Sequence, residues 1–228
     1  NVTLNIFDGA KVTLEDGQNS TIDEANIKNG TLTASIFQKD NAFKTVNLEE
    51  QGVFNITKLN SKTADATDYD RLLLAYDSTY NLKGGRLAVA GQTYTGDIRV
   101  GTNPSKSETG APTNKGKGML NVSAGSYTFA DMSVRDQGEV NVKGGKLSVA
   151  DLDVVRGGKV NVNGGTLDVS GDLTLANKDG LTLQSGKLVT KGANVFTQAT
   201  GGNWIASTVW GNVNKEGGVL EITDSIKG

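Results

Sequence analysis

The sequence repeats itself at a step of 20 residues. Residues 138–150 read GEVNVKGGKLSVA, and residues 158–170 read GKVNVNGGTLDVS. Self-similarity at a fixed step is typical of folds that stack one structural unit on the next, whereas a single catalytic centre needs no repetition. The same pattern fits residues 118–130, 80–90 and 181–188. It fits residues 52–56 more weakly.

Each unit holds three short runs of alternating apolar and polar residues, here Glu139–Lys143, Lys146–Ala150 and Asp151–Val155. Alternation at period two indicates strands with one buried face. Glycines between the runs let the chain turn sharply, and the corners of this unit lack the Asn-Gly and Asp-Gly signals of hairpins. An antiparallel sandwich also uses many short strands, but it does not require the same side chains at a fixed step.

The sequence therefore predicts an all-β fold, a right-handed parallel β-helix with about 20 residues and three short strands in each coil. The unit is not the six-residue type that builds left-handed prisms, which favours the right hand. Counterpart residues should then stack about 4.8 Å apart along the axis. Six interior columns are expected: Leu120, Val140, Val160 and Leu181; Val122, Val142, Val162 and Leu183; Tyr127, Leu147, Leu167 and Leu188; Phe129, Val149 and Val169; Met132, Leu152 and Leu173; Val134, Val154 and Leu175.

We expect residues 1–228 to form a single β-helical segment, a fragment of a longer chain since it begins without Met. Two stretches break the period and are predicted to be loops pushed out from corners: 61–70 and 101–117, the second holding both prolines. Residues 191–228 drift away from the repeat and contain both tryptophans.

The composition excludes several classes of site. The chain has no cysteine and no histidine, which removes disulfides, thiolate nucleophiles, zinc–sulfur sites and Ser-His-Asp triads. A formal net charge of -2 gives no electrostatic reason to expect nucleic-acid binding. No apolar run reaches the length of a membrane helix. We expect no cofactor and no membrane insertion by this segment.

The clearest polar feature is a column of asparagines, each lying between two inward apolar residues, so that alternation turns it outward. Stacked amides can hydrogen-bond along the axis, so a structural ladder is preferred over a ligand site. Its predicted members are Asn81, Asn121, Asn141 and Asn161, with Asn55 as a further candidate.

Acidic residues recur at Asp131, Asp151 and Asp172. A carboxylate column could bind Ca²⁺, but the calcium-binding nonapeptide pattern is missing, and capping of turn amides is the preferred interpretation.

Arg156 near Asp151 and Asp153 could imitate the base of a β-helical polysaccharide lyase, although surface charge accounts for it more simply. A glycosidase needs only two carboxylates, yet no acidic pair departs from the repeat. We therefore expect no catalytic and no metal-binding residues.

Candidate partner-binding residues lie where the repeat fails. The 101–117 segment carries Lys106, Lys115 and Lys117, which could engage an anionic partner, although a solvated loop needs no function. Trp204 and Trp210 could stack on sugar rings, although in a divergent terminal coil they more often close the end of the core.

Runs such as GKVNVNGGTLDVSGDLTL and GEVNVKGGKLSV resemble passenger domains of Gram-negative autotransporters and related β-helical surface adhesins. The resemblance implies export, display at the bacterial cell surface and outer membrane, a role in virulence, and a β-barrel translocator in the same full-length chain. It carries over no functional residue.

The expected function is non-catalytic: adhesion, self-association or spacing at the cell surface. Its partners would be a host-cell or bacterial surface protein or glycan, or a second copy. The alternatives are a glycan-active β-helical enzyme, lyase- or glycosidase-like, and a surface-layer or matrix protein.

Overall fold

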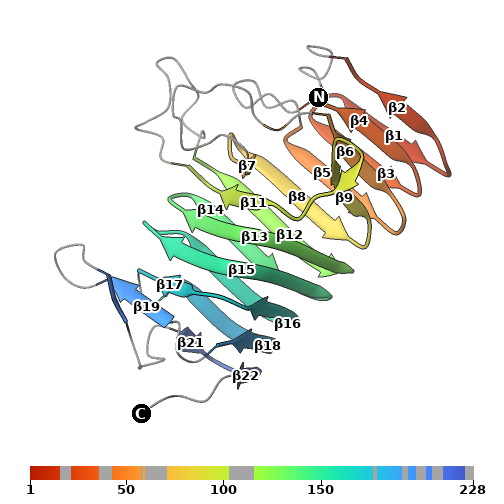
Figure 1. Cartoon of the computed structure of the whole chain (residues 1–228). Helices are drawn as coiled ribbons and strands as arrows, with labels where there is room; N and C mark the ends of the chain where they lie inside the picture. The colour runs from red at the N-terminus through yellow and green to blue at the C-terminus, as the bar shows by residue number, and fades with distance from the viewer. Residues whose placement is uncertain are drawn as a thin grey trace, which may run out of the picture.

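The chain forms an all-β structure of mostly parallel strands (Figure 1). The computed structural model describes residues 1–15, 22–35, 43–57, 59, 71–102, 116–176, 179–191 and 213–223, and the backbone path of 195–198 and 204–206. Within these ranges every element is a strand, grouped in one sheet of 17 strands and a second of five. The predicted all-β class and parallel pairing are confirmed at this level.

The strands fall into three series, within each of which neighbours come from successive repeats. The first series opens each repeat and pairs in parallel throughout. It contains β1 (Thr3–Phe7), β3 (Glu24–Lys28), β5 (Thr45–Glu49), β8 (Ser78–Lys83), β12 (Gly118–Ala124), β14 (Gly138–Val142), the first parts of β16 (Lys159–Val169) and β18 (Leu181–Thr190), and β21 (Val213–Lys215).

The second series is split into two parallel groups. One group is β2 (Lys11–Thr13), β4 (Thr31–Ala34), β6 (Val53–Ile56) and β9 (Arg86–Val89), which make the smaller sheet together with β10 (Gln92–Thr93). The other group is the first part of β13 (Ser126–Arg135), the first part of β15 (Lys146–Val155), the later parts of β16 and β18, and β22 (Val219–Ile222).

The third series begins at β7 and provides the last strand of each repeat that follows it. It contains β7 (Arg71–Leu74), β11 (Asp97–Val100), the later parts of β13 and β15, β17 (Leu173–Leu175) and β19 (Val195–Gln198), with β20 (Trp204–Ala206) antiparallel to β19. The expected boundary at Ala150–Asp151 is absent, because pairing with β13 continues through the bend and β15 is one ten-residue strand.

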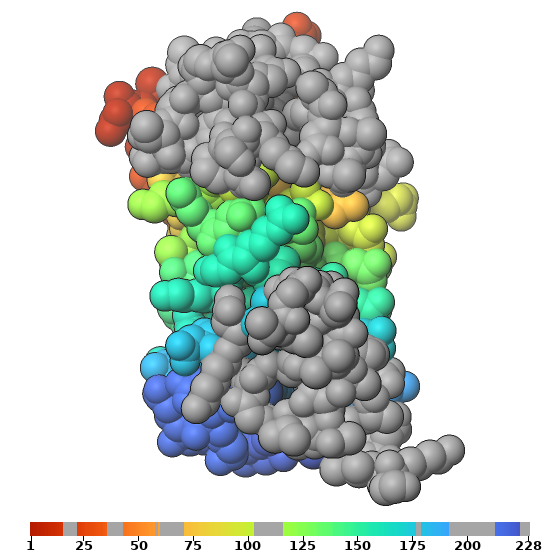
Figure 2. Space-filling view, turned by 90° about the vertical axis from the view of Figure 1, so that its left-hand side faces the viewer, coloured from red at the N-terminus to blue at the C-terminus, as the bar shows by residue number. Residues whose placement is uncertain are grey.

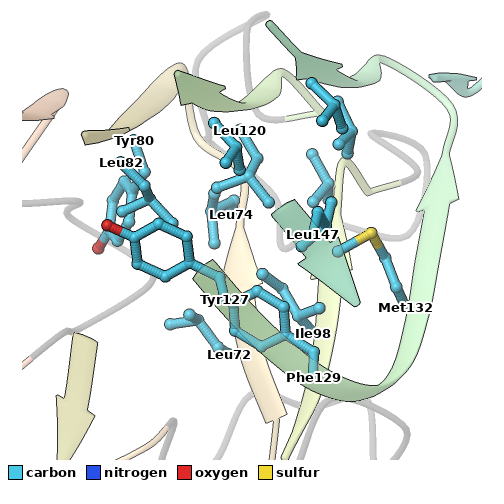
Figure 3. Close-up of a cluster of buried hydrophobic side chains, with 14 of the residues drawn as sticks. Leu72, Leu74, Tyr80, Leu82, Ile98, Leu120, Tyr127, Phe129, Met132 and Leu147 are labelled. Atoms are coloured by element: carbon cyan, nitrogen blue, oxygen red, sulfur yellow. The ribbon is translucent and has the colours of Figure 1, made fainter. Parts of the chain in front are cut away.

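All six predicted interior columns are confirmed. Leu120, Val140, Val160 and Leu181 pair in register, and the other five columns do the same. Every member is buried, none being more than 6% exposed. Figure 3 shows how these side chains meet between the series, with Tyr127 and Phe129 beside Leu72, Ile98 and Met132. One continuous apolar core therefore joins the repeats, and the residues follow one another along the molecule from N- to C-terminus (Figure 2).

The N-terminal third pairs in register with the same stack, although the 20-residue frame identified no repeat before residue 52. Thr3 pairs with Glu24, and Glu24 with Thr45, at a step of 21 residues. The weak match at 52–56 was wrong in register: residues 53–56 pair with 86–89 in the second series, not with the strands that open a repeat. Residues 61–70 and 103–115 lie outside the described residues, although Thr102 N–H donates to the Gly116 carbonyl at 3.1 Å, so the two ends of the latter segment are adjacent.

Glycines at the corners are required for two different reasons: some adopt a left-handed φ, and others lie where there is no space for a Cβ atom. Between the first and second series Gly145 takes a φ of 64°, as predicted for a sharp turn. At the corner before the next repeat Gly157 has a φ of 84°, but left-handed positions also fall on Arg156 and Asp136, with φ of 50° and 56°. The glycine that follows, Gly138, is needed for space, because a Cβ there would lie 2.0 Å from the Val100 carbonyl oxygen.

Substituting Gly138→Ala should cost about 3 kcal/mol of unfolding free energy, because the obstructing oxygen belongs to a paired strand that cannot withdraw. Gly9→Ala is the matched control: its φ is 83° but no atom lies within 4 Å of a Cβ, so we expect a loss of about 1 kcal/mol. Urea unfolding of the two variants measures the difference. Equal losses would show that backbone freedom, not space, decides the corner.

Stability should also depend on alkaline pH through Tyr80. This side chain is 4% exposed and lies edge-on to Phe54, with ring centroids 6.0 Å apart, and burial raises the pKa of its phenol strongly. A pKa raised on folding gives stability that is present below the unfolded value of about 10 and lost as pH rises above it. The free energy of unfolding should therefore fall from about pH 9 to about pH 11 more steeply in the wild type than in Tyr80→Phe. Parallel curves from urea titrations would contradict this.

Candidate functional site

The parallel stacking of the second series is interrupted after β9. The chain turns back through Ala90 and Gly91, whose φ values are 48° and 79°, and β10 pairs antiparallel with the free edge of β9. Tyr94 N–H extends this hairpin by donating to the Leu87 carbonyl at 2.9 Å. Because that edge is taken, β13 pairs with β15 and β11 but not with β9.

A pocket of about 390 Å³ lies at this interruption. Its walls come from two successive corners, from the start of β9, from the segment after β10 and from the start of β13. The residues that line it are Glu50, Gln51, Gly52, Val53, Gly84, Gly85, Arg86, Leu87, Thr93, Tyr94, Thr95, Ser126, Tyr127, Thr128 and Phe129. We define these residues as the hairpin pocket and treat it as the candidate functional site.

Three aromatic rings form the apolar part of the hairpin pocket. Tyr94 is partly exposed and lies against Phe129, with centroids 6.2 Å apart and planes at 57°. Its hydroxyl donates to the Asp97 carbonyl, and the Tyr127 hydroxyl accepts from Gly84 N–H at 3.0 Å. Burial raises the pKa of Tyr127, against the effect of that hydrogen bond. Both tyrosine rings are therefore fixed at their hydroxyl ends.

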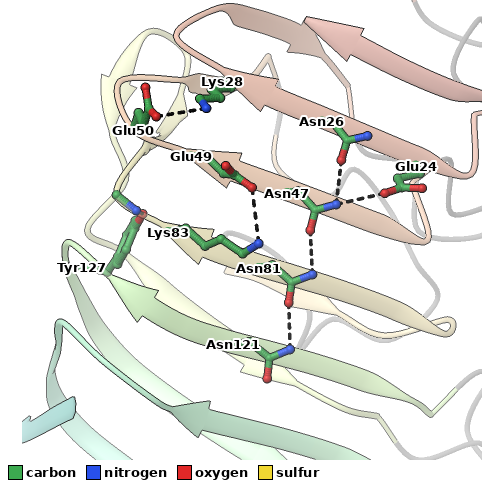
Figure 4. A network of polar contacts seen from close by, with 11 residues as sticks. Glu24, Asn26, Lys28, Asn47, Glu49, Glu50, Asn81, Lys83, Asn121 and Tyr127 are labelled. Carbon is green, nitrogen blue, oxygen red and sulfur yellow. Dashed lines mark hydrogen bonds and ion pairs between the residues drawn. The ribbon is translucent and has the colours of Figure 1, made fainter. Parts of the chain in front are cut away.

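The two charged side chains of the pocket differ in their partners. Glu50 accepts from Asn29 Nδ2 at 2.6 Å and lies 3.2 Å from Lys28 Nζ, and these two contacts hold its pKa below the usual range (Figure 4). The exposed Arg86 donates through Nη1 to the Gly91 carbonyl at 3.4 Å. Within the described ranges no carboxylate forms an ion pair with Arg86. The uncompensated charge at the pocket is therefore positive.

The asparagine column is a hydrogen-bonded ladder along the first series. Asn121 Nδ2 donates to Asn81 Oδ1 at 2.8 Å, Asn141 to Asn121 at 2.9 Å, and Asn161 to Asn141 at 3.0 Å. The ladder continues toward the N-terminus through Asn47, Asn26 and Asn5, at 2.7, 2.7 and 2.9 Å, as Figure 4 shows in part. Donation always runs toward the preceding repeat. Asn121 is only 7% exposed, so the ladder is less open to solvent than alternation alone suggests.

Asn55 is not in this ladder. It lies in β6 of the second series, where its Oδ1 accepts from Gly91 N–H at 2.8 Å and so holds the turn of the β9–β10 hairpin. The apolar–Asn–apolar triplets at Leu4–Ile6, Ala25–Ile27 and Val46–Leu48 are the sequence signal that identifies the N-terminal members.

The aspartate column caps backbone amides. Asp97 Oδ1 accepts from Asp131 N–H at 3.1 Å, and Asp151 Oδ1 from Asp172 N–H at 2.7 Å. Partial desolvation, then neighbouring carboxylates, raise the pKa of Asp131, and partial desolvation likewise raises that of Asp153. Among the described residues no group of three possible metal ligands comes together.

The sequence predicts Arg156 near Asp151 and Asp153, but the arginine that affects the pKa of Asp153 is Arg135. Arg135, from the preceding repeat, opposes the raised pKa of Asp153, whereas Arg156 is an exposed corner residue. The structure thus forms no Arg156–Asp153 ion pair.

Of the predicted partner-binding residues, the structure describes the side chain of Lys117 alone, which does not line the hairpin pocket. Lys117 is exposed just before β12, and its carbonyl accepts from Asp77 N–H at 2.9 Å. Trp204 begins β20, of which only the backbone is described. Lys106, Lys115 and Trp210 lie outside the described residues. The sequence alone did not identify the hairpin pocket. The only sign of it was that Gly91 and Tyr94 fall in a stretch where the repeat is longer than 20 residues.

The chain was compared with protein-family models, with curated proteins and with solved structures. No family model, curated protein or solved structure matches the chain. Within the described residues no helix could span a membrane.

The direction of the ladder predicts an asymmetry between two identical substitutions. Asn121→Asp removes the donor to Asn81 and sets a charged oxygen against Oδ1, so we expect a loss of about 2–3 kcal/mol. Asn5→Asp keeps the ladder contact, since Asn5 only accepts, and should stay within about 0.5 kcal/mol of the wild type. Urea unfolding at neutral pH tests both, and similar losses would contradict the assigned direction.

Proposed function

We propose that residues 1–228 form one right-handed parallel β-helix, with about 20 residues and three short strands per coil. The three series would be the three faces of the coil. The support is that all three series step by 20 or 21 residues between β12 and β18, so that one repeat contributes a strand to each. The N-terminal repeats have described strands of the first two series only.

We further propose that this β-helix is a non-catalytic segment displayed outside a bacterial cell, which acts in adhesion, with self-association and spacing as related roles. The observation that carries this proposal is the long in-register stack, in which each repeat is stabilised by its neighbours. Such a fold can form one repeat after another, without disulfides, as suits a chain exported in an extended state.

The resemblance to autotransporter passengers supplies the cellular setting of the proposal. It implies an outer-membrane location, a β-barrel translocator in the full-length chain, and a surface protein, a glycan or a second copy as partner. An extended rod suits this role because many weak contacts along it add up to firm attachment.

A bead assay tests the proposal. Beads coated with the purified chain should attach to cultured animal cells, whereas beads coated with urea-unfolded chain should not. Clumping of coated beads without cells would assign self-association instead. Release of reducing ends from neutral or acidic polysaccharides by the free protein, abolished in Asp153→Asn, would overturn the non-catalytic assignment. Absence of attachment and of clumping would exclude both binding roles and leave spacing.

A further inference from the structure

We propose that the hairpin pocket binds an acidic sugar residue of a glycan. This inference names a ligand site for the adhesive role and rests on that role only for its biological use. Its physical basis is local: an aromatic floor, four exposed hydroxyl side chains without a hydrogen bond to any described residue, and a guanidinium without an ion pair in the described part of the chain.

The pocket has the size and fixed shape of a small-ligand site. Its volume of about 390 Å³ lies at the lower end of the range for such sites. The floor cannot rearrange freely, because Tyr94 and Tyr127 are each anchored by a backbone hydrogen bond and Phe129 is 2% exposed. A pre-formed pocket avoids the entropy cost of ordering its walls when a ligand enters.

The lining combines the two surfaces that a sugar ring presents. The partly exposed Tyr94 offers an aromatic face, on which the C–H side of a pyranose can pack. Around it stand four exposed hydroxyl side chains, none of which hydrogen-bonds to another described residue: Thr93, Thr95, Ser126 and Thr128. Each hydroxyl both donates and accepts, as sugar hydroxyls do, so the two sets are complementary.

The charge of the pocket selects an acidic sugar over a neutral one. Glu50 already forms an ion pair with Lys28, as Figure 4 shows, and accepts a hydrogen bond from Asn29. The planar guanidinium of Arg86 has donors to spare and can hold a carboxylate through two parallel hydrogen bonds. A uronic acid or similar sugar acid therefore fits better than a neutral hexose.

Titration of the ¹⁵N-labelled chain followed by NMR tests this with a matched pair of probes, methyl β-D-glucuronide and methyl β-D-glucoside. The glucuronide should shift the amides of 93–95 and 126–129 and bind about tenfold more tightly than the glucoside. Sodium acetate is the third probe. Equal binding of acetate and glucuronide would mean recognition of a carboxylate alone, as on an acidic peptide, and would overturn the proposal.

Four variants separate the contributions, each first checked for an unchanged thermal midpoint. Arg86→Gln should abolish the preference for the glucuronide, and Thr128→Val should weaken both sugars. Tyr94→Leu should remove binding of both; if it fails to fold, Thr128→Val carries that test. Arg156→Gln, which removes an exposed arginine at another corner, should change nothing.

Shifts outside the hairpin pocket, or none at concentrations up to 50-fold above those of the protein, would also overturn the proposal. Cell attachment without sugar binding would leave the proposed function standing. Sugar binding without cell attachment would contradict the adhesive role alone.

Discussion

The in-register parallel pairing of each strand with its counterpart one repeat away is the constraint on which the rest of the structure depends. A slip of one residue would turn each interior column outward and bring charged residues such as Glu139 and Lys159 inside. The same register brings each asparagine amide to the next oxygen and each aspartate to the next backbone N–H. A change of register would therefore disrupt the apolar core, the asparagine ladder and the aspartate caps at the same time.

Interruption of that pairing is what creates a concave surface. A stack of identical repeats is closely packed and offers little room for a ligand. After β9 the free edge has to be covered, as exposed strand edges generally are, and the short hairpin arm β10 does this. The cost is a gap between β9 and β13, which Tyr94 fills only in part. The proposed binding site thus lies where repetition stops.

The sequence predicts the structure well where the step is constant and poorly where it varies. From 118 to 190 every interior column follows from the 20-residue repeat. Toward the N-terminus, Thr45 pairs with Thr79 and Thr79 with Met119, steps of 34 and 40 residues that hide the shared triplets. Gly91 and Tyr94 mark an irregular stretch in the sequence, but they do not predict a pocket. Whether Ala90–Gly91 starts a corner or a reversal depends on which strand edge is free, and that is a property of the assembled stack.

The ladder of asparagines makes its own two ends, at Asn5 and at Asn161, electrically unequal. Its amide dipoles all point the same way. The Nδ2 group of Asn5 lies at one end of the row, and the Oδ1 atom of Asn161 lies at the other. Aligned dipoles add, as they do in an α-helix, so the row has a partial positive pole and a partial negative pole. Asn5 and Asn161, which occupy equivalent places in the repeat, therefore lie at poles of opposite sign, although both stand in the same apolar–Asn–apolar triplet.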